Sequence, residues 1–382
     1  MRLPLPLLSS LVHLYVGWRL LPALLPGTPI AAGGLAAWLV ASALLLPLSL
    51  GGSRGRHEGR VLKVAALVAM GLFSSLFVST FLRDLALLAG TVWSFAADGS
   101  QERLQAFTVW SARGVPLLAL AVTAVGTFNA RRTASVRRVD VPIAGLPAGF
   151  DGFTIAQLSD VHVGPTIRAP YVQALVDRVN ALQADMVAIT GDLVDGSVPA
   201  LSPHVAPLAT LRSRHGSFFV TGNHEYYAGA HAWIAELERI GMTVLLNRHV
   251  AIADPRGGTA PLVLAGVADY GAAHFDAAHR SDAVAALAGS PPQAAARVLL
   301  AHQPRSAAGA AAAGFDLQLS GHTHGGQFWP WNHFVRFQQP YVAGLHRLDR
   351  MWVYVSRGTG YWGPPKRFGA PSEITLLRLV AA

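Results

Sequence analysis

The sequence predicts an α/β domain that follows an α-helical transmembrane domain, and three observations support this prediction. Beyond about residue 150, short apolar runs of strand type alternate with helical patterns. Before about residue 130, long stretches contain no Asp, Glu, Lys or Arg. Histidines and aspartates gather at the ends of several of the short apolar runs. With 382 residues, the chain is long enough for more than one domain.

The N-terminal third, residues 1–130, is the predicted transmembrane domain. Only 13% of the chain is charged, against about 25% in ordinary soluble proteins, and the mean hydropathy is +0.38. Arg19 and Arg113 interrupt the apolar character and could reach the interface, line a polar groove or mark span ends. A cleaved signal peptide fits less well, because the apolar character continues beyond any leader. A spanning helix needs about 20 mostly apolar residues, and we expect four spans, at about 4–25, 30–50, 62–82 and 106–128.

Charge is distributed unevenly along the chain. Residues 1–140 hold 13 Lys and Arg against 5 Asp and Glu, whereas residues 141–382 hold 17 against 16. The pI of about 10.4 therefore belongs to the membrane half and does not indicate a nucleic-acid partner. By the positive-inside rule, four spans would put the N-terminus, both basic clusters and the C-terminal half in the cytoplasm, and a fifth span around Leu85–Ala97 would invert this. The clusters are Arg54, Arg56, Arg60 and Lys63, then Arg131, Arg132, Arg137 and Arg138.

Residues 131–150 are predicted to be a basic linker between the two domains. The four arginines are followed by Pro142, Gly145, Pro147 and Gly149. The cations either bind an anionic membrane surface, at about 1 kcal/mol each, or act only as a topology signal. The chain contains no cysteine, which excludes disulfides and thiolate zinc sites but does not choose a compartment.

Residues 151–382 are predicted to form one domain of alternating strands and helices. Pro170–Leu182 begins with proline and has an apolar helical face, and Ala230–Ile240 is a helix ended by Gly241. Ala307–Gly314 is alanine-rich and predicts a short helix. Further strands are expected at Leu262–Val267, Met351–Val355 and Glu373–Val380.

Five polar motifs stand where apolar runs end. The runs are Phe153–Leu158, Met186–Thr190, Phe218–Thr221, Val298–Ala301 and Leu317–Ser320. They are typical of buried parallel strands, whose carboxyl ends meet at the sheet edge where sites form. In order, the motifs are Asp160-Val161-His162, Gly191-Asp192-Leu193-Val194-Asp195, Gly222-Asn223-His224-Glu225, Ala301-His302-Gln303 and Gly321-His322-Thr323-His324.

Together the motifs predict a two-metal hydrolytic centre. They offer two carboxylates, four imidazoles and one amide as ligands, with one histidine to spare. Two divalent cations roughly 3.5–4 Å apart can clamp a phosphoryl group and supply hydroxide at neutral pH, and a shared carboxylate holds them together. Asp160 and His162 can reach one point only if their strand ends and curls there. For any single histidine a structural role is the simpler explanation, but the ordered set favours metal binding.

The order of the five motifs resembles the calcineurin-like metallophosphoesterase superfamily, over roughly residues 150–382. The resemblance implies a four-layer α/β/β/α sandwich with two mixed sheets face to face. It implies that Asp160, His162 and His324 hold one metal. Asn223, His302 and His322 would hold the other, and Asp192 would bridge the two. The cations would be Mn, Fe or Zn.

Two further motif residues would not be ligands. The resemblance implies that His224 is catalytic and stabilises the transition state or protonates the leaving oxygen. Asp195 is expected to cap or anchor its loop. Longer matches resemble a membrane-associated branch, which includes bacterial phosphodiesterases similar to UDP-2,3-diacylglucosamine pyrophosphatase and transmembrane metallophosphoesterases of animals. These matches are Gly222–Tyr227, Gly321–Gln327 and Ser356–Gly360.

An aromatic segment, residues 328–341, bears on the substrate. Its rings either cover a sheet edge as core or enter the lipid headgroup region beside the site. The second reading favours a membrane-bound protein that hydrolyses a lipid phosphodiester or pyrophosphate. The bilayer is then the expected partner, with no nucleic acid and no protein partner inferred. The aromatic residues are Phe328, Trp329, Trp331, Phe334, Phe337 and Tyr341.

Alternatives to the lipid substrate remain open at this stage. A soluble substrate could be a nucleotide, a nucleic acid or a phosphoprotein. A catalytically silent membrane sensor or scaffold is a different class of protein, and the intact set of ligands argues against it. Arg357, Lys366 and Arg367 could hold phosphate charge or lie on the surface.

Overall fold

The computed structural model describes residues 4–50, 59–94 and 100–382, and the chain divides into two compact units. The helical unit comprises Met1–Phe128 and Gly363–Phe368, and the α/β unit comprises Asn129–Trp362 and Gly369–Ala382. The basic-loop residues Arg54 and Arg56 lie outside the described residues.

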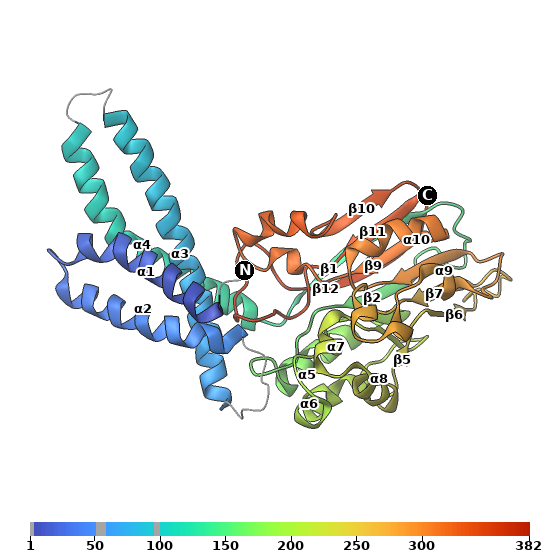
Figure 1. The fold of residues 1–382 in the computed structure, drawn as a ribbon. Coiled ribbons are helices and arrows are strands. Elements are labelled where there is room, and N and C mark those ends of the chain that lie inside the picture. The colour runs from blue at the N-terminus through green and yellow to red at the C-terminus, as the bar shows by residue number, and fades with distance from the viewer. Residues whose placement is uncertain (1–3, 51–58, 95–99) are drawn as a thin grey trace. The chain divides into compact units, whose positions relative to one another are not determined.

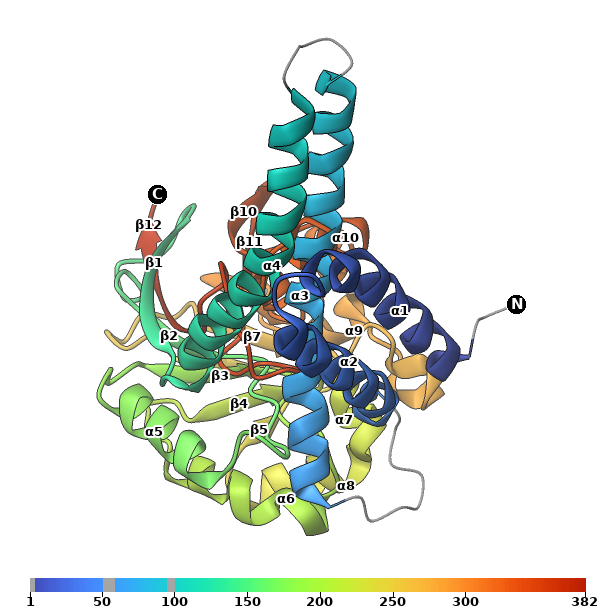
Figure 2. The same ribbon diagram turned by 90° about the vertical axis from the view of Figure 1, so that its left-hand side faces the viewer.

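Long apolar helices build the helical unit, and Figures 1 and 2 show α3 and α4 as neighbours that run in opposite directions. Their packing buries a cluster that includes Val16, Leu20, Phe73 and Ala119. Between α1 and α2, the Ser9 hydroxyl donates a hydrogen bond to the Ala43 carbonyl at 2.9 Å. The helices are α1 (Leu5–Leu24), α2 (Pro29–Leu50), α3 (Arg60–Ser94) and α4 (Ser100–Arg131).

Each of these four helices is long and apolar enough to cross a membrane. The prediction of four apolar helices ahead of the α/β unit is confirmed. Helix α3 is longer than its predicted span, with 35 residues, and at 1.5 Å per residue it extends for about 52 Å. It contains the possible fifth span around 85–97 as far as Ser94, and residues 95–97 lie outside the described part.

Two six-stranded sheets form the centre of the α/β unit (Figure 1). The first has the order β1-β12-β2-β3-β4-β5, with parallel pairing from β2 to β5. Its strands are β1 (Ser135–Ile143), β12 (Glu373–Ala381), β2 (Thr154–Leu158), β3 (Met186–Thr190), β4 (Ser217–Val220) and β5 (Thr243–Val244).

The second sheet has the order β10-β11-β9-β8-β7-β6 and is parallel through its four central strands. Both sheets are mixed, because β12 in the first sheet and β6 and β10 in the second pair antiparallel. The strands are β10 (Gly344–Leu348), β11 (Met351–Val355), β9 (Leu317–Ser320), β8 (Ala296–Leu300), β7 (Leu262–Gly266) and β6 (Arg248–Ile252).

Alternation of side chains along the strands produces four layers. Ile155 of β2 and Leu264 of β7 belong to one buried cluster, which fills the space between the two sheets. Ala156 packs on the other side, with residues of α5 and α8. Ala265 likewise packs with α9 and α10. The helices are α5 (Ala169–Asn180), α6 (Val198–Val205), α7 (Asn223–Ala228), α8 (Ala230–Arg239), α9 (Ala283–Leu287) and α10 (Ala307–Ala313). The predicted α/β/β/α sandwich is therefore confirmed.

The segment predicted as a basic linker differs from that prediction. Residues 135–143 form β1, which pairs in parallel along its whole length with β12. Arg137 and Arg138 are exposed on this strand at the end of the sheet, and Asp140 forms an exposed ion pair with Arg378 at 2.6 Å. Charges on an edge strand are common because they prevent further strand pairing. Because of the same charges, the hydrophobicity pattern of this segment does not predict a strand.

The expected single domain at 151–382 is also interrupted, because Gly363–Phe368 belongs to the helical unit. Within that unit, Lys366 Nζ donates to the Gly71 carbonyl of α3 at 3.0 Å, and the Arg367 amide donates to the Gly126 carbonyl of α4 at 2.8 Å. Both side chains are buried. The structure therefore assigns Lys366 a packing role among helices, in place of the expected phosphate or surface role.

Candidate metal centre

The predicted ligands all follow the carboxyl ends of parallel strands. In the first sheet, Asp160 and His162 follow β2, Asp192 follows β3, and Asn223 begins α7 after β4. In the second sheet, one ligand follows β8 and two follow β9, namely His302, His322 and His324. Since the two sheets pack face to face, these ends meet at one edge of the sandwich.

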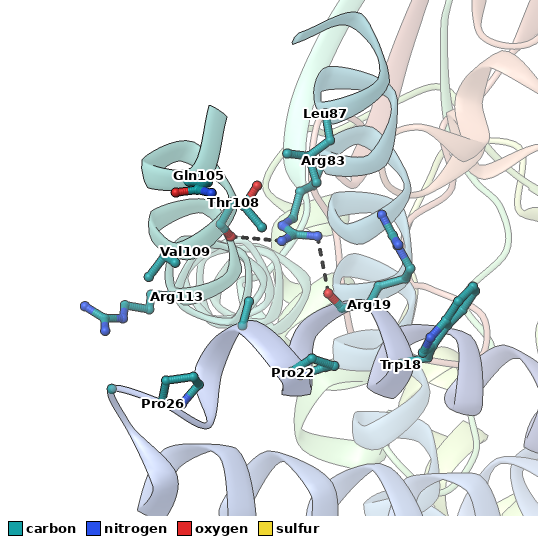
Figure 3. Close-up of a pocket in the computed structure, with 12 residues that line it drawn as sticks. Trp18, Arg19, Pro22, Pro26, Arg83, Leu87, Gln105, Thr108, Val109 and Arg113 are labelled. Atoms are coloured by element: carbon teal, nitrogen blue, oxygen red, sulfur yellow. Dashed lines mark hydrogen bonds between the residues drawn. The ribbon is translucent and has the colours of Figure 1, made fainter. Parts of the chain in front are cut away.

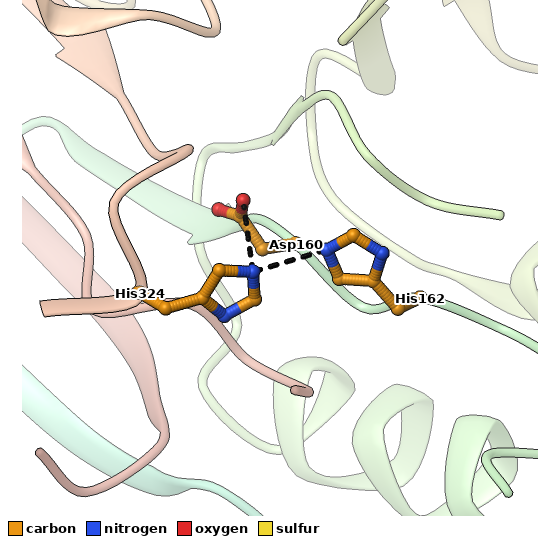
Figure 4. A group of neighbouring side chains, drawn as sticks. All are labelled: Asp160, His162 and His324. Atoms are coloured by element: carbon orange, nitrogen blue, oxygen red, sulfur yellow. Dashed lines mark hydrogen bonds and ion pairs between the residues drawn. The ribbon is translucent and has the colours of Figure 1, made fainter. Parts of the chain in front are cut away.

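One group of ligand atoms is formed by Asp160, His162 and His324, whose donor atoms lie within 4.8 Å of one another (Figure 4). The Nε2 atoms of His162 and His324 are 3.0 Å apart, and His324 Nε2 lies 3.6 Å from Asp160 Oδ1. All three residues are buried. Two imidazole nitrogens and a carboxylate oxygen that point to a common position have the arrangement of a metal site.

A second group is formed by Asp192, His302 and His322. His302 Nε2 lies 3.1 Å from Asp192 Oδ2 and 3.2 Å from His322 Nδ1. Asp192 also groups with His162 and His224, and its Oδ2 is 3.9 Å from His162 Nε2. Asp192 therefore lies between the two sets of ligands, which is where a bridging carboxylate must stand.

Asn223 provides a test of whether a cation fits these residues. Its amide oxygen is buried and accepts no hydrogen bond from the part of the chain that the structure describes. An unsatisfied buried polar atom costs about 1–3 kcal/mol, and a divalent cation would satisfy it. Imidazole, carboxylate and amide oxygen together suit Mn, Fe or Zn. The residues thus fit a dinuclear divalent metal centre.

The backbone at the site is strained, which explains how residues two apart can reach one point. Five of the predicted ligands have positive φ values: Asp160 (54°), His162 (54°), Asp192 (52°), His322 (70°) and His324 (51°). For residues other than glycine this region costs of the order of 1–3 kcal/mol each and is concentrated at functional sites. Backbone hydrogen bonds hold the turns, from Asp160 N to Gly191 O at 3.0 Å and from His162 N to Asp192 O at 3.1 Å.

Asp195 has a larger part in the site than the sequence suggested. Its Oδ1 lies 2.8 Å from Nδ1 of His162 and 2.8 Å from Nδ1 of His224. A carboxylate in this position fixes the tautomer and the orientation of a metal-binding or catalytic imidazole. The expected role of capping the loop is therefore corrected to that of orienting two histidines. The spacing of the Gly-Asp-x-x-Asp motif could not identify those partners, because both come from other strand ends.

Glu225 performs the loop-anchoring role that was expected of Asp195. Its buried carboxylate accepts hydrogen bonds from the amides of Asp192 at 3.0 Å, Leu193 at 2.8 Å and Gly222 at 2.6 Å. These bonds tie the loop after β3 to the loop after β4. Glycine is required at position 222, because an added Cβ would collide with Asp192.

The groups of the centre differ in protonation state. Burial opposes the charged form of His302, but the charge of Asp192 raises its pKa well above the usual value, so a cation bound by His302 would displace a proton. Burial, together with the charge of His302, lowers the pKa of His322 to about 3, so its imidazole is neutral as a ligand must be. Burial opposes ionisation of Asp192, yet the adjacent His302 lowers its pKa well below the usual value. Burial also opposes the charged form of His224, but the bond to Asp195 and the charge of Asp192 raise its pKa to about 9. His224 therefore carries a proton at neutral pH.

Comparisons with known proteins agree with this centre. The family model described as "Calcineurin-like phosphoesterase" matches residues 153–326. A metallophosphoesterase of Aquifex aeolicus is 31% identical over 246 residues, which are 64% of this chain and 91% of that protein. The chain belongs to the calcineurin-like metallophosphoesterase family. The family uses dinuclear divalent metals, which supports a metal-dependent phosphoester hydrolase.

Other relatives are named as transmembrane proteins. A "Transmembrane protein with metallophosphoesterase domain" of Bos taurus is 41% identical over 280 residues, covering 70% of this chain and 63% of that protein. The metallophosphoesterase described here thus spans less than two thirds of that relative's length. Together with the four apolar helices, this likeness indicates association with a membrane. A dimetal phosphatase of Danio rerio has 13% identity and a TM-score of 0.36, covering 55% of this chain and 88% of that one.

Proposed function

We propose that this protein is a multi-pass membrane phosphoesterase that hydrolyses phosphodiester or pyrophosphate bonds of a lipid-linked substrate on the cytoplasmic side. The centre described above supports the hydrolysis. The helical unit and the exposed rings of the aromatic segment support the lipid substrate.

The residues would divide the chemistry as follows. Asp160, His162 and His324 would hold one cation, and Asn223, His302 and His322 the other, with Asp192 between them. Two divalent cations bound there would neutralise phosphoryl charge and activate water. His224 lies on the exposed side of the centre, with 16% of its side chain accessible. Its Nδ1 is held by Asp195, so Nε2 is the atom that donates a proton to the leaving oxygen.

Exposure of the aromatic segment is the observation that favours a lipid substrate. Trp329, Trp331, Phe334 and Phe337 expose 45%, 40%, 55% and 83% of their surface, whereas Phe328 is buried and anchors the segment. The ring centroid of Phe334 lies 5.7 Å from that of Trp331 and 6.3 Å from that of Phe337, so the three rings form one apolar surface. Rings at this density on a solvated face would be unfavourable, whereas the membrane interface favours them.

A comparison of substrates tests this proposal. Trp331, Phe334 and Phe337 are replaced by serine together in the full-length protein, and Val284→Ser provides an exposed apolar control outside the segment. Hydrolysis of phospholipids in mixed micelles should fall by about ten-fold or more, while a soluble chromogenic diester is hydrolysed at the unchanged rate. An equal loss on both substrates, or a wild-type preference for soluble nucleotides or phosphopeptides, would contradict the lipid assignment.

Cysteine labelling tests the cytoplasmic orientation. Because the sequence contains no cysteine, each introduced cysteine is the one thiol that a reagent can label. Single cysteines are introduced in place of Gly59, before α3, and Gln101, at the start of α4. In intact cells a membrane-impermeant maleimide should label Gln101→Cys and leave Gly59→Cys unlabelled. The reverse pattern would put the metal centre on the outer side.

A further inference from the structure

A cavity of about 840 Å³ lies within the helical unit, and three arginines line it. Arg19 comes from α1, Arg83 from α3 and Arg113 from α4 (Figure 3). The size falls in the range of ordinary ligand sites, which is about 300–1,000 Å³. Charged side chains among membrane-spanning helices are rare and mark sites for ligands or ions. We call this cavity the arginine pocket.

The pocket lies where one uncharged run of α3 ends and one uncharged run of α4 begins. In α3 the uncharged run Val64–Leu82 ends at Arg83, and in α4 the run Gly114–Ala130 begins after Arg113. Figure 2 shows that α3 and α4 run in opposite directions. By their positions in the sequence, both arginines therefore stand at the same end of their runs. The run in α3 rises about 28 Å, close to the thickness of about 30 Å of a bilayer's hydrocarbon core. A bilayer centred on these two runs would place the guanidinium groups at headgroup depth.

Two tryptophans beside the pocket support this depth. The Arg19 guanidinium lies 5.6 Å from the ring centroid of Trp18, and that of Arg113 lies 5.1 Å from the ring centroid of Trp110. The two rings expose 73% and 68% of their surface. Exposed tryptophans are concentrated at the interface between hydrocarbon and headgroups. With these runs in the hydrocarbon core, the arginine pocket would open where lipid phosphates lie.

The pocket has an excess of positive charge. Asp84 pairs with Arg19 at 2.9 Å and lies 3.6 Å from Arg83. Three guanidinium groups against this one carboxylate leave two positive charges. Arg83 is fixed in place, because it donates to Ser111 Oγ at 3.0 Å and to the Thr108 carbonyl at 2.9 Å. No aspartate or glutamate is among the residues that line the cavity.

Arg113 is the group that remains available for a ligand. Its Nε is buried and has no hydrogen-bond partner in the described part of the protein. Its Nη2 lies against Gly27, where there is no side chain to displace it. A guanidinium with an unsatisfied edge recognises phosphate through two parallel hydrogen bonds, and such charge-assisted bonds are strong.

We propose that the arginine pocket binds a phosphate group, either in the headgroup of an anionic phospholipid or as a soluble phosphate. None of its lining residues belongs to the metal centre. The pocket is therefore a binding site separate from the hydrolytic one, and its occupant is held by charge and is not cleaved there.

The test is a binding titration on the full-length protein in a neutral detergent. Isothermal titration is carried out with dioctanoyl phosphatidylglycerol, with dioctanoyl phosphatidylcholine and with inorganic phosphate. Phosphatidylglycerol should bind at least about ten-fold more tightly than phosphatidylcholine, and Arg113→Gln should remove about ten-fold of that affinity. Arg103→Gln is the matched control, since Arg103 is exposed on α4 and does not line the pocket.

A second variant guards against misfolding of Arg113→Gln. In Gly27→Ala the new methyl would occupy the place of Arg113 Nη2, so the guanidinium must move while its charge is kept. This variant should also weaken phosphatidylglycerol binding. Both variants should hydrolyse a soluble diester at the wild-type rate, whereas Asp192→Asn should lose hydrolysis and keep phosphatidylglycerol binding.

The results decide between the sources of phosphate. If inorganic phosphate competes with phosphatidylglycerol in the wild-type protein and this competition is lost in Arg113→Gln, the pocket is assigned to soluble phosphate. If inorganic phosphate does not compete, the pocket is assigned to the lipid headgroup. Wild-type affinity for phosphatidylglycerol in both pocket variants, or equal affinity for phosphatidylcholine, would overturn the proposal. Such a failure would leave the hydrolytic assignment intact, because the two are measured on different variants.

Discussion

The α/β unit and the helical unit both gather charged residues, but they do so by different physical means. In the α/β unit, buried Asp192 and His302 meet because parallel strands end at one edge. In the helical unit, Arg83 and Arg113 line one pocket because uncharged runs of similar length align antiparallel helices. Strand ends therefore fix which individual residues form a site. Uncharged helical runs fix only the position along the helices at which charged residues lie.

The two units also differ in where backbone strain lies. Among the described residues, those other than glycine with positive φ all belong to the α/β unit, and five of the nine are predicted ligands. The helical unit has none in its described part. Stored strain at a site is stabilised by the structure around it, here by Glu225 and its bonds to four loop amides. We therefore expect variants of the metal centre to lower turnover, and packing variants of the helical unit to change stability while turnover stays the same.

The largest effect is expected for Asp192→Asn. The substitution removes the charge that lies between the two ligand groups, so hydrolysis of a chromogenic phosphodiester should fall by roughly a thousand-fold. Metal content by elemental analysis should fall as well. Asp140→Asn, which alters only an exposed ion pair, is the control and should keep both. Full metal content with normal turnover in Asp192→Asn would show that this carboxylate does not bridge.

His224→Ala should follow, with both metals retained and turnover reduced by about 10²–10⁴-fold. The loss should depend on the substrate, because a leaving group such as nitrophenolate departs without a proton. An alkyl ester, which needs protonation, should suffer most. Unchanged turnover of the alkyl ester would mean that His224 is not the acid.

Asp195 should give a smaller effect, since it acts through His162 and His224. Asp195→Ala is expected to lower metal affinity and turnover by about 10–100-fold. Asp195→Asn keeps an acceptor oxygen and should lose less than the alanine variant. A metal titration followed by kinetics at saturating metal separates the two contributions. Equal losses in both variants would point to the negative charge alone, and not to orientation of the rings.

The smallest effect concerns packing in the helical unit. Gly126→Ala would place a methyl against Lys366, and the overpacking should cost about 1–3 kcal/mol, partly offset by better helix propensity. At Gly114 nothing lies within 4 Å of an added Cβ, so Gly114→Ala should instead stabilise by about 0.5–1 kcal/mol. Thermal unfolding in detergent measures both, and turnover of a soluble ester should not change. A stabilised Gly126→Ala would disprove the packing of residues 363–368 on α4.

Much of the fold could be predicted because local patterns determine it. Met186–Thr190 and Leu317–Ser320 were predicted as strands with their observed bounds, since each is a short apolar run bounded by polar residues. Strand β1 was missed, because Arg137, Arg138 and Pro142 mask its alternation and its pairing with β12 is remote in sequence. Likewise, no local signal could assign Gly363–Phe368 to the helical unit.

The sequence predicts which residues form the candidate site. It predicts few of the contacts that hold those residues in place. Short motifs name the ligands, and the structure brings six of the seven into groups. The seventh, Asn223, has a buried amide oxygen that accepts no hydrogen bond from the described residues. The roles of individual ligands remain predictions. The bonds of Asp195 to two histidines, and the arginine pocket, could not be predicted, because each depends on side chains from separate elements meeting in space.

The central claim is that two divalent cations at this centre carry out the hydrolysis. The most direct test counts metal ions per chain in the purified full-length protein by elemental analysis, while turnover of a phosphodiester is followed during chelation and reloading. We predict two ions per chain and a turnover that disappears and returns with them. A chain that holds a single ion, or none, and still hydrolyses the substrate at the full rate would contradict the account.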